Sequence, residues 1–214
     1  MRIPKHIAII PDGNRRWAQH SGFEKQAGYE HGLMPGVEVL RLAEKYGVEE
    51  LTYYGFTTDN CKRPAVQVKA FTKACVDAIK LIQSENARLL VVGNTHSSMF
   101  PQELLPLTKT RTTFNAGTVK VNFLVNYGWE WDLGHLDPTA SSRTDIMHAI
   151  GSHDISRIDL VVRWGGRRRL SGLLPVQAVY ADFFVIDEMW PDFCEEQFVR
   201  ALSWYNEQDI TLGG

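Results

Sequence analysis

The stretch HIAIIPDGNRRWA, residues 6–18, decides the fold of this chain. Residues 6–10 are almost entirely apolar, which predicts a strand buried on both faces of a parallel sheet. The strand ends at Pro11, and polar and charged side chains follow at its carboxyl end, the edge at which open α/β sheets bind ligands. A glycine in the turn lets backbone N–H groups approach an anion, and arginines bind phosphate oxygens through paired hydrogen bonds. The stretch therefore predicts an anion site, with the candidates Gly13, Asn14, Arg15 and Arg16. Asp12 in their midst is explained if it holds a divalent cation or handles a proton. The alternative is a helix-capping aspartate beside solvated arginines.

A second buried strand also ends in positive charge, in DLVVRWGGRRRLS, residues 159–171. A Gly-Gly turn follows Arg163, and one diphosphate can accept hydrogen bonds from several guanidinium groups at once. The anion-binding candidates are Arg163, Arg167, Arg168, Arg169 and Ser171. The alternative is a solvated basic turn. Two polar stretches, 57–64 and 126–132, also follow predicted strands, but their Asn and Thr side chains could simply close turns.

Short β-branched runs alternate with longer helical patterns along the rest of the chain. This alternation predicts a single α/β domain over residues 1–214, an open and mostly parallel sheet with helices on both faces. Strands are predicted at residues 6–10, 51–55, 88–93, 120–125, 159–163 and 182–186, and helices at 36–46, 64–82 and 195–205. The apolar stripe along 68–82 is typical of core packing more than of a cofactor site. Residues 129–156 are irregular and predict a mobile loop or short helical pieces.

Composition narrows the class of protein. The 214 residues carry 23 Lys and Arg against 25 Asp and Glu, a net charge of −2, which argues against a nucleic-acid-binding surface. Three separated cysteines form no CxxC pair, so reduced thiols and a cytoplasmic location are expected. The apolar runs are far shorter than the roughly 20 residues that cross a bilayer, so no integral membrane segment is expected. Motifs for ATP hydrolysis, dinucleotide binding, α/β-hydrolase and zincin chemistry are missing from the sequence.

Taken in order, five segments resemble the cis-prenyltransferase family, which includes undecaprenyl diphosphate synthases. They are HIAIIPDGNRRWA at 6–18, GFTTDNCKRP at 55–64, NYG at 126–128, RWGGRRRLS at 163–171 and WPDF at 190–193. The terminal Gly213 and Gly214 are similar to the family's usual ending, without the arginine that commonly precedes it. The resemblance implies the cis-prenyltransferase fold, a homodimer, and a Mg²⁺-dependent transfer between isoprenyl diphosphates.

The resemblance also implies roles for individual residues. Asp12 would hold Mg²⁺, and Asp182 stands where the family has a metal-binding glutamate. The catalytic candidates are Asp12, Asn14, Tyr29 and Arg63. Arg15, Arg16 and Lys25 would bind the allylic diphosphate, and Arg163, Arg169 and Ser171 the second diphosphate. Gly13, Thr57, Asn60, Trp129, Trp164 and Arg167 complete the substrate-binding candidates.

Several positions depart from the family's pattern. Tyr29 replaces the histidine of its GHxxG motif, and since a phenol titrates near 10 and an imidazole near 6.5, the proton handling must differ. Arg167 replaces a glutamate, which reverses a charge at the second diphosphate. Trp129 replaces Gly and Trp164 replaces Thr, and their bulk predicts a shortened product tunnel beside a helix at 68–82. Further replacements are Lys25 for Arg, Asp59 for Glu, Cys61 for Trp and Glu130 for Arg.

The hypothesis is a Mg²⁺-dependent prenyltransferase that condenses short allylic isoprenyl diphosphates into a short-chain product, with branched or cyclised products included. One alternative is a terpene cyclase acting on a single prenyl diphosphate. Another is a non-catalytic partner subunit that binds prenyl diphosphates without turnover. The expected partners are isoprenyl diphosphates and a second copy of the chain.

Overall fold

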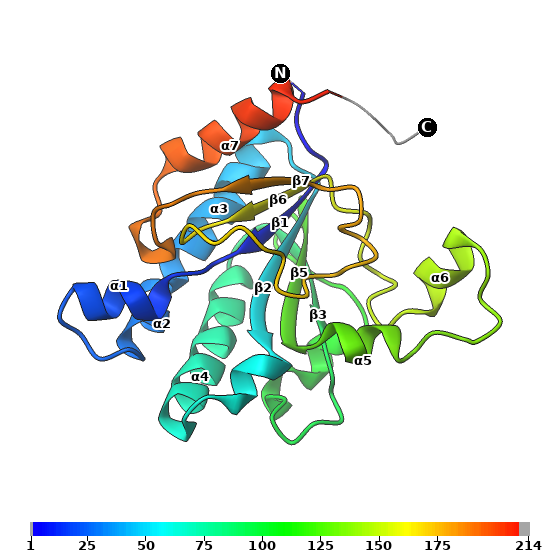
Figure 1. The fold of residues 1–214 in the computed structure, drawn as a ribbon, viewed down its shortest axis with the longest axis horizontal. Coiled ribbons are helices and arrows are strands. Elements are labelled where there is room, and N and C mark those ends of the chain that lie inside the picture. The colour runs from blue at the N-terminus through cyan, green and yellow to red at the C-terminus, as the bar shows by residue number, and fades with distance from the viewer. Residues whose placement is uncertain (1, 210–214) are drawn as a thin grey trace.

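The computed structural model describes residues 2–209 and contains one seven-stranded sheet in the order β4-β3-β5-β2-β1-β6-β7 (Figure 1). Every neighbouring pair is parallel except β3 and β4, which are antiparallel. The strands are β1 (His6–Ile10), β2 (Glu50–Thr57), β3 (Ala87–Val92), β4 (Thr112–Phe114), β5 (Val119–Tyr127), β6 (Leu160–Arg163) and β7 (Asp182–Val185). The parallel strands therefore share one carboxyl edge, where the charged segments after β1 and β6 meet.

Helices of very different length connect the strands. The α-helices are α1 (Asn14–His20), α2 (Ala27–His31), α3 (Leu33–Tyr46), α4 (Ala65–Ile82), α5 (Trp129–Leu133), α6 (Arg143–Ala149) and α7 (Glu195–Glu207). Three 3₁₀ helices are η1 (Thr58–Lys62), η2 (Gln102–Thr108) and η3 (Trp190–Asp192). None of these described helices is long and apolar enough to cross a membrane.

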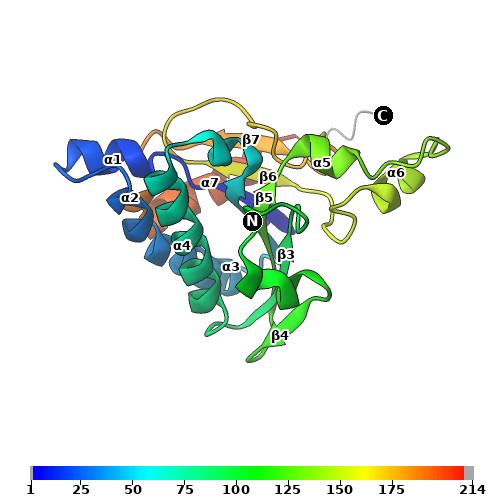
Figure 2. The same cartoon turned by 90° about the horizontal axis from the view of Figure 1, so that it is seen from below.

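The two faces of the sheet carry separate apolar clusters. One face packs against α3, α4 and α7 in a large core that includes Leu40, Ile79 and Phe198. The other is covered by α5 and by irregular chain before and after β6, through Ile158 and Leu174. Figure 2 shows α5 and α6 on the opposite side of the sheet from α3 and α4. The long helices on one face therefore serve mainly as packing, and the loops of the other reach the carboxyl edge.

The predicted fold class is confirmed, and all six predicted strands are present within two residues of their expected bounds. The irregular stretch 129–156 contains the short helices α5 and α6, and α6 buries none of its residues. Strand β4 was not predicted. It is a three-residue edge strand that pairs with β3 and is only partly buried, so it carries no continuous apolar signal.

Candidate active site

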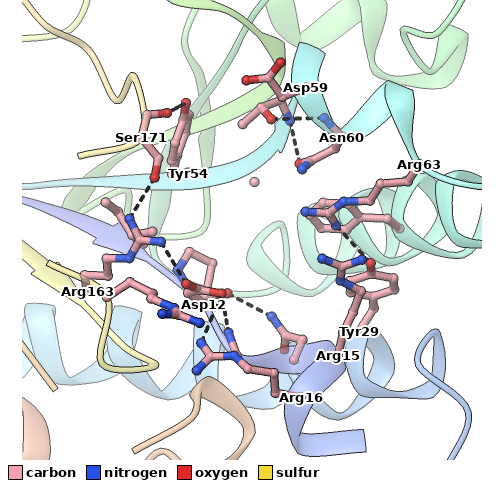
Figure 3. Close-up of a pocket in the computed structure, with 18 of the residues that line it drawn as sticks. Asp12, Arg15, Arg16, Tyr29, Tyr54, Asp59, Asn60, Arg63, Arg163 and Ser171 are labelled. Carbon is pink, nitrogen blue, oxygen red and sulfur yellow. Dashed lines mark hydrogen bonds and ion pairs between the residues drawn. The ribbon is translucent and has the colours of Figure 1, made fainter. Parts of the chain in front are cut away.

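A cavity of about 560 Å³ opens at the carboxyl edge of the sheet, between the segments that follow β1, β2 and β6 (Figure 3). The structure brings fourteen of the predicted site residues together on its wall. They are Asp12, Gly13, Asn14, Arg15, Arg16, Lys25, Tyr29, Thr57, Asn60, Arg63, Arg163, Arg167, Arg169 and Ser171. Seven lining side chains are cationic, whereas Asp12 and Asp59 are the two carboxylates among the lining residues. The surplus of positive charge suits a highly charged anion.

Asp12 follows β1 directly and faces this cavity. Its Oδ2 accepts a 2.8 Å hydrogen bond from Arg163 Nη2, and its Oδ1 accepts one of 2.6 Å from the backbone N–H of Gly13. Arg16 Nη2 lies 3.6 Å from Oδ1. Burial acts to raise the pKa of Asp12, but the Arg163 hydrogen bond and charge, with the Gly13 and Arg16 contributions, hold it below its ordinary value. The carboxylate is therefore ionised at neutral pH, and 32% of its side chain remains exposed.

Gly13 allows the chain to turn sharply after Asp12. Its φ is 103°, a left-handed conformation, and a Cβ built on it would lie 2.9 Å from Met189 Cβ. A larger residue is strained in this conformation and also clashes with Met189. Glycine at this position therefore lets α1 begin at Asn14, directly beside the cavity.

Arg163 connects two parts of the cavity. Besides holding Asp12, its Nη1 donates a 2.8 Å hydrogen bond to Ser171 Oγ and a further one to the Arg169 carbonyl. The side chain is 5% exposed, so these partners replace the water that its two Nη atoms would otherwise bind. The resemblance placed Arg163 with the second diphosphate alone, whereas the structure shows that it also binds Asp12.

Tyr29 and Arg63 form a pair on the opposite wall. Tyr29 lies on α2, and its ring stacks on Phe71 of α4 with 4.6 Å between centroids. Arg63 Nη1 donates a 3.0 Å hydrogen bond to the Tyr29 hydroxyl oxygen. Because that oxygen already accepts from Arg63, the Tyr29 O–H remains free to donate to an anion in the cavity.

Other predicted residues are partly occupied by contacts within the protein. Arg15 Nη1 donates to Gln67 Oε1 at 3.1 Å, and Arg16 Nη2 to the Gly165 carbonyl at 2.8 Å. Thr57 and Asn60 cap η1 with reciprocal side-chain-to-backbone hydrogen bonds, which matches the alternative that they close a turn. Asn14 Nδ2 donates to the Pro11 carbonyl, so its amide also holds the loop after β1 in place. Roles of these five residues toward a substrate remain predictions.

Trp164 does not line the cavity, contrary to its predicted place as a substrate-binding residue. It is fully buried beneath α7, where its indole N–H donates to Gln197 Oε1 at 2.8 Å and its ring meets Trp190 edge-on. Successive side chains point to opposite faces of a sheet, so Arg163 facing the cavity places Trp164 on the far face.

Trp129 is also outside the cavity lining. It begins α5, is 46% exposed, and its indole lies against Gly172. The positions of Trp129 and Trp164 therefore do not support the prediction that their indoles shorten a product tunnel.

The structure does not bring Asp182 to Asp12. Asp182 opens β7 opposite Leu160, which in turn lies opposite Ile7 of β1. Asp12 lies beyond Ile10, so at about 3.3 Å per residue more than ~10 Å of strand separates the carboxylates. The two residues form no common metal site within one chain. Gly213 and Gly214 lie outside the described residues.

Asp12 is the lining residue best suited to a metal ion. In the part of the chain that the structure describes, no three His, Cys, Asp or Glu side chains gather as a ready-made cage. Mg²⁺, however, is usually held by one or two carboxylates together with substrate phosphates and water. An ionised and partly exposed carboxylate beside a cationic cavity fits that pattern.

Sequence reasoning missed Tyr54 and Phe71, which both line the cavity. Tyr54 lies in a buried strand and Phe71 on the apolar stripe of α4, so both resembled ordinary core residues. The sequence feature that could have indicated Tyr54 is a hydroxyl-bearing side chain near the end of a buried strand that leads into a polar segment.

The fold and this cavity define an α/β enzyme that handles anionic substrates at the carboxyl edge of a parallel sheet. The sequence model of the family described as "Putative undecaprenyl diphosphate synthase" matches residues 10–213. The chain belongs to this family, and it is accordingly a prenyltransferase of the cis-prenyl diphosphate synthase type.

Individual relatives agree with this placement. The chain is 33% identical to the ditrans,polycis-undecaprenyl-diphosphate synthase ((2E,6E)-farnesyl-diphosphate specific) of Yersinia pseudotuberculosis, over 100% of this chain and 91% of that protein. It is 32% identical to the synthase of the same name from Escherichia coli K12, over 98% and 90%. Its fold is similar to lavandulyl diphosphate synthase from Lavandula x intermedia in complex with dimethylallyl diphosphate, with a TM-score of 0.86, 21% identity and 99% of each chain covered.

Proposed function

We propose that this chain is a Mg²⁺-dependent prenyltransferase that condenses short isoprenyl diphosphates into a short-chain terpenoid diphosphate. The observation that carries the proposal is a cavity with seven cationic side chains that is backed by aromatic rings. The charge suits diphosphates, and the rings limit the length of the hydrocarbon.

Six of the seven cationic residues fall into two groups across the cavity, and the seventh, Arg63, is paired with Tyr29. Arg15, Arg16 and Lys25 come from the α1 region, and Arg163, Arg167 and Arg169 from β6 and the turn after it. Two substrates that each carry a diphosphate need two such groups. We assign the α1 group to the allylic donor and the β6 group to the acceptor.

Charge neutralisation is the main chemical task of these residues. In the transfer, the bond between the allylic carbon and the diphosphate oxygen breaks, and negative charge develops on the departing diphosphate. Arginines of the α1 group stabilise that charge, and the Tyr29 hydroxyl donates a hydrogen bond to it. Mg²⁺ held by Asp12 would supply further charge neutralisation. The double bond of the acceptor then attacks the allylic cation, and the transfer of a proton to the departed diphosphate restores a double bond.

An aromatic layer limits the space beyond the charged cavity. Phe71 stacks on Tyr29 and meets Phe56 edge-on at 5.4 Å between centroids. On the sheet, a Cβ built on the lining residue Gly55 would lie 2.5 Å from Phe123 Cε1. Rings therefore fill the space between α2, α4 and the sheet. The relatives above are named for long undecaprenyl products, but interiors are packed too densely to admit such a chain here without moving these rings.

We expect products of about 10–20 carbons, because the aromatic layer leaves little room for a longer hydrocarbon. Whether they are linear, branched or cyclised depends on how the acceptor double bond is presented. A cyclase acting on one diphosphate is the alternative, because the same charge stabilisation serves both reactions.

The test is incubation of the purified protein and Mg²⁺ with dimethylallyl, geranyl and farnesyl diphosphates, each with and without isopentenyl diphosphate. Mass spectrometry of the dephosphorylated products identifies chain length and connectivity. Short products that require two diphosphates support the proposal, and cyclic products from a single diphosphate support the alternative. Long polyprenyl products would refute the size limit, and no turnover with any combination would refute the function.

A variant of the aromatic layer tests the size limit separately. Phe123→Leu keeps an apolar side chain but opens space beside Gly55, so it should shift the products toward longer chains. Trp164→Leu is the matched control, because Trp164 is a buried ring on the same face of the sheet but packs against Trp190 and Gln197, which do not line the cavity. An unchanged product distribution in Phe123→Leu would show that this ring does not limit the product.

A further inference from the structure

We infer that Tyr54 and Trp129 are positioning residues that hold the 169–172 turn, which carries the acceptor-diphosphate ligands Arg169 and Ser171. Neither side chain needs to touch the substrate to do so. The claim that this turn binds the acceptor diphosphate rests on the proposed function. The claim that Tyr54 and Trp129 hold the turn in place does not.

The 169–172 turn has a backbone that needs external support. Ser171 has a φ of 55° and Gly172 one of 79°, two successive residues in the left-handed region. For a serine this conformation is costly and persists only where surrounding groups enforce it. The turn is exposed on its outer side at Arg169 and Leu170, so the enforcing groups lie beneath it.

Tyr54 supports the turn from the sheet. It is 7% exposed, and its hydroxyl donates a 2.8 Å hydrogen bond to the Ser171 carbonyl. Burial raises the pKa of Tyr54, so the hydroxyl keeps its proton and remains a donor throughout the range in which the enzyme works. The ring is itself held by an edge-on contact with Tyr127, whose hydroxyl is fixed by the buried Asp132.

Trp129 supports the same turn from α5. A Cβ built on Gly172 would lie 2.9 Å from Trp129 Cδ1, so the indole lies directly against the Gly172 backbone. This contact accounts for a large apolar residue that is half exposed at the start of a short helix. The turn is thus held between a hydroxyl and an indole that come from β2 and α5.

Arg163 links the 169–172 turn to Asp12 in the charged cavity. The Ser171 hydroxyl and the Arg169 carbonyl both accept from Arg163 Nη1, and Arg163 Nη2 binds Asp12. If the turn relaxes, these two acceptors move away from Arg163. Loss of the Tyr54 hydroxyl should therefore weaken acceptor binding directly, and donor binding to a smaller extent through Arg163 and Asp12.

The first experiment reads the turn itself and needs no substrate. Backbone amide hydrogen exchange of residues 169–173, measured by mass spectrometry, should be faster in Tyr54→Phe and in Trp129→Ala than in the unmodified protein. Tyr53→Phe is the matched control, because the neighbouring Tyr53 hydroxyl also donates to a backbone carbonyl, that of Gly36, but on the other face of the sheet. Exchange that is unchanged in both variants would overturn the inference, even if the enzyme is an active prenyltransferase.

The second experiment measures how the loss of this support changes the KM for the acceptor. Tyr54→Phe should raise the KM for isopentenyl diphosphate by between about twofold and tenfold, the loss expected for one neutral hydrogen bond, and raise the KM for the allylic diphosphate by a smaller factor. In a Ser171→Ala background the same substitution should have a much smaller effect, because both changes act on one turn. Fully additive effects would overturn the inference, since they would mean that Tyr54 contacts the substrate directly. If the unmodified protein turns over no prenyl diphosphate, the proposed function fails, and the exchange experiment still decides the inference.

Discussion

Removal of the Arg163 side chain should damage the active site far more than removal of an arginine outside the cavity lining. Its hydrogen bond to Asp12 joins two charges, and its bond to Ser171 joins a charge to a hydroxyl. Hydrogen bonds to charged groups contribute about 1.5–3 kcal/mol each, and because Asp12 is a third exposed the lower figure applies to both. Arg163→Ala should therefore raise the activation free energy that governs kcat/KM by about 3 kcal/mol, which lowers kcat/KM roughly 100-fold.

The pH profile of the same variant gives a second, independent readout. Arg163 is the main group that lowers the pKa of Asp12 against the opposing effect of burial. Without it, the largest of the groups that lower the pKa of Asp12 is lost and that pKa rises, so the ionised form is lost at a higher pH. The acidic limb of kcat/KM should accordingly move to higher pH in Arg163→Ala.

Steady-state kinetics of Arg163→Ala and Arg168→Ala, with thermal unfolding to confirm folding, provides the assay. Arg168 belongs to the same loop but lies outside the cavity lining, with its guanidinium 4.0 Å from Asp187. The reasoning is refuted if Arg163→Ala loses no more activity than Arg168→Ala, or if its acidic limb stays in place.

Three further predictions concern the metal ligand, a buried histidine and the oligomeric state. Asp12→Asn should reduce turnover by at least about 100-fold, because an amide cannot replace an ionised carboxylate, while circular dichroism stays unchanged; near-normal turnover would contradict the metal assignment. Burial lowers the pKa of His6, so the unfolded chain binds its proton at higher pH than the native state, and the free energy of unfolding should fall as pH drops below about 6.5. Urea unfolding at several pH values should show this loss in the unmodified protein and a weaker one in His6→Gln. The protein should sediment as a homodimer, and a fully active 24.3 kDa monomer would exclude that prediction.

The sequence predicted the sheet well because its strands are buried on both faces. In β1 and β6 an apolar run leads directly into a charged turn. The sequence therefore predicts both the strand and the end at which it contributes to the site. Strand β4 could not be predicted, because its three residues lie at an edge of the sheet, none of them is buried, and they form no apolar run.

The site was predicted where a residue's place follows from chain order, and missed where it follows from side-chain direction. Asp12, Arg163 and Ser171 come directly after strand ends, so their meeting at one edge could be foreseen. Trp164 was wrongly assigned because bulk near a strand end was considered without the alternation that turns it to the other face. The role of Tyr54 depends on a partner 117 positions away, Ser171, which no local pattern reveals.

The position of Arg163 between Asp12 and Ser171 makes the two halves of the cavity thermodynamically dependent on each other. A ligand that engages the Asp12 carboxylate changes the partner available to Arg163 Nη2, and with it the orientation of the guanidinium that Nη1 presents to the 169–172 turn. By reciprocity, an acceptor that draws Arg163 toward Ser171 must alter the affinity for the donor by the same factor. Substrate affinities of this enzyme should therefore show cooperativity between unlike ligands, carried by one side chain without any movement of domains.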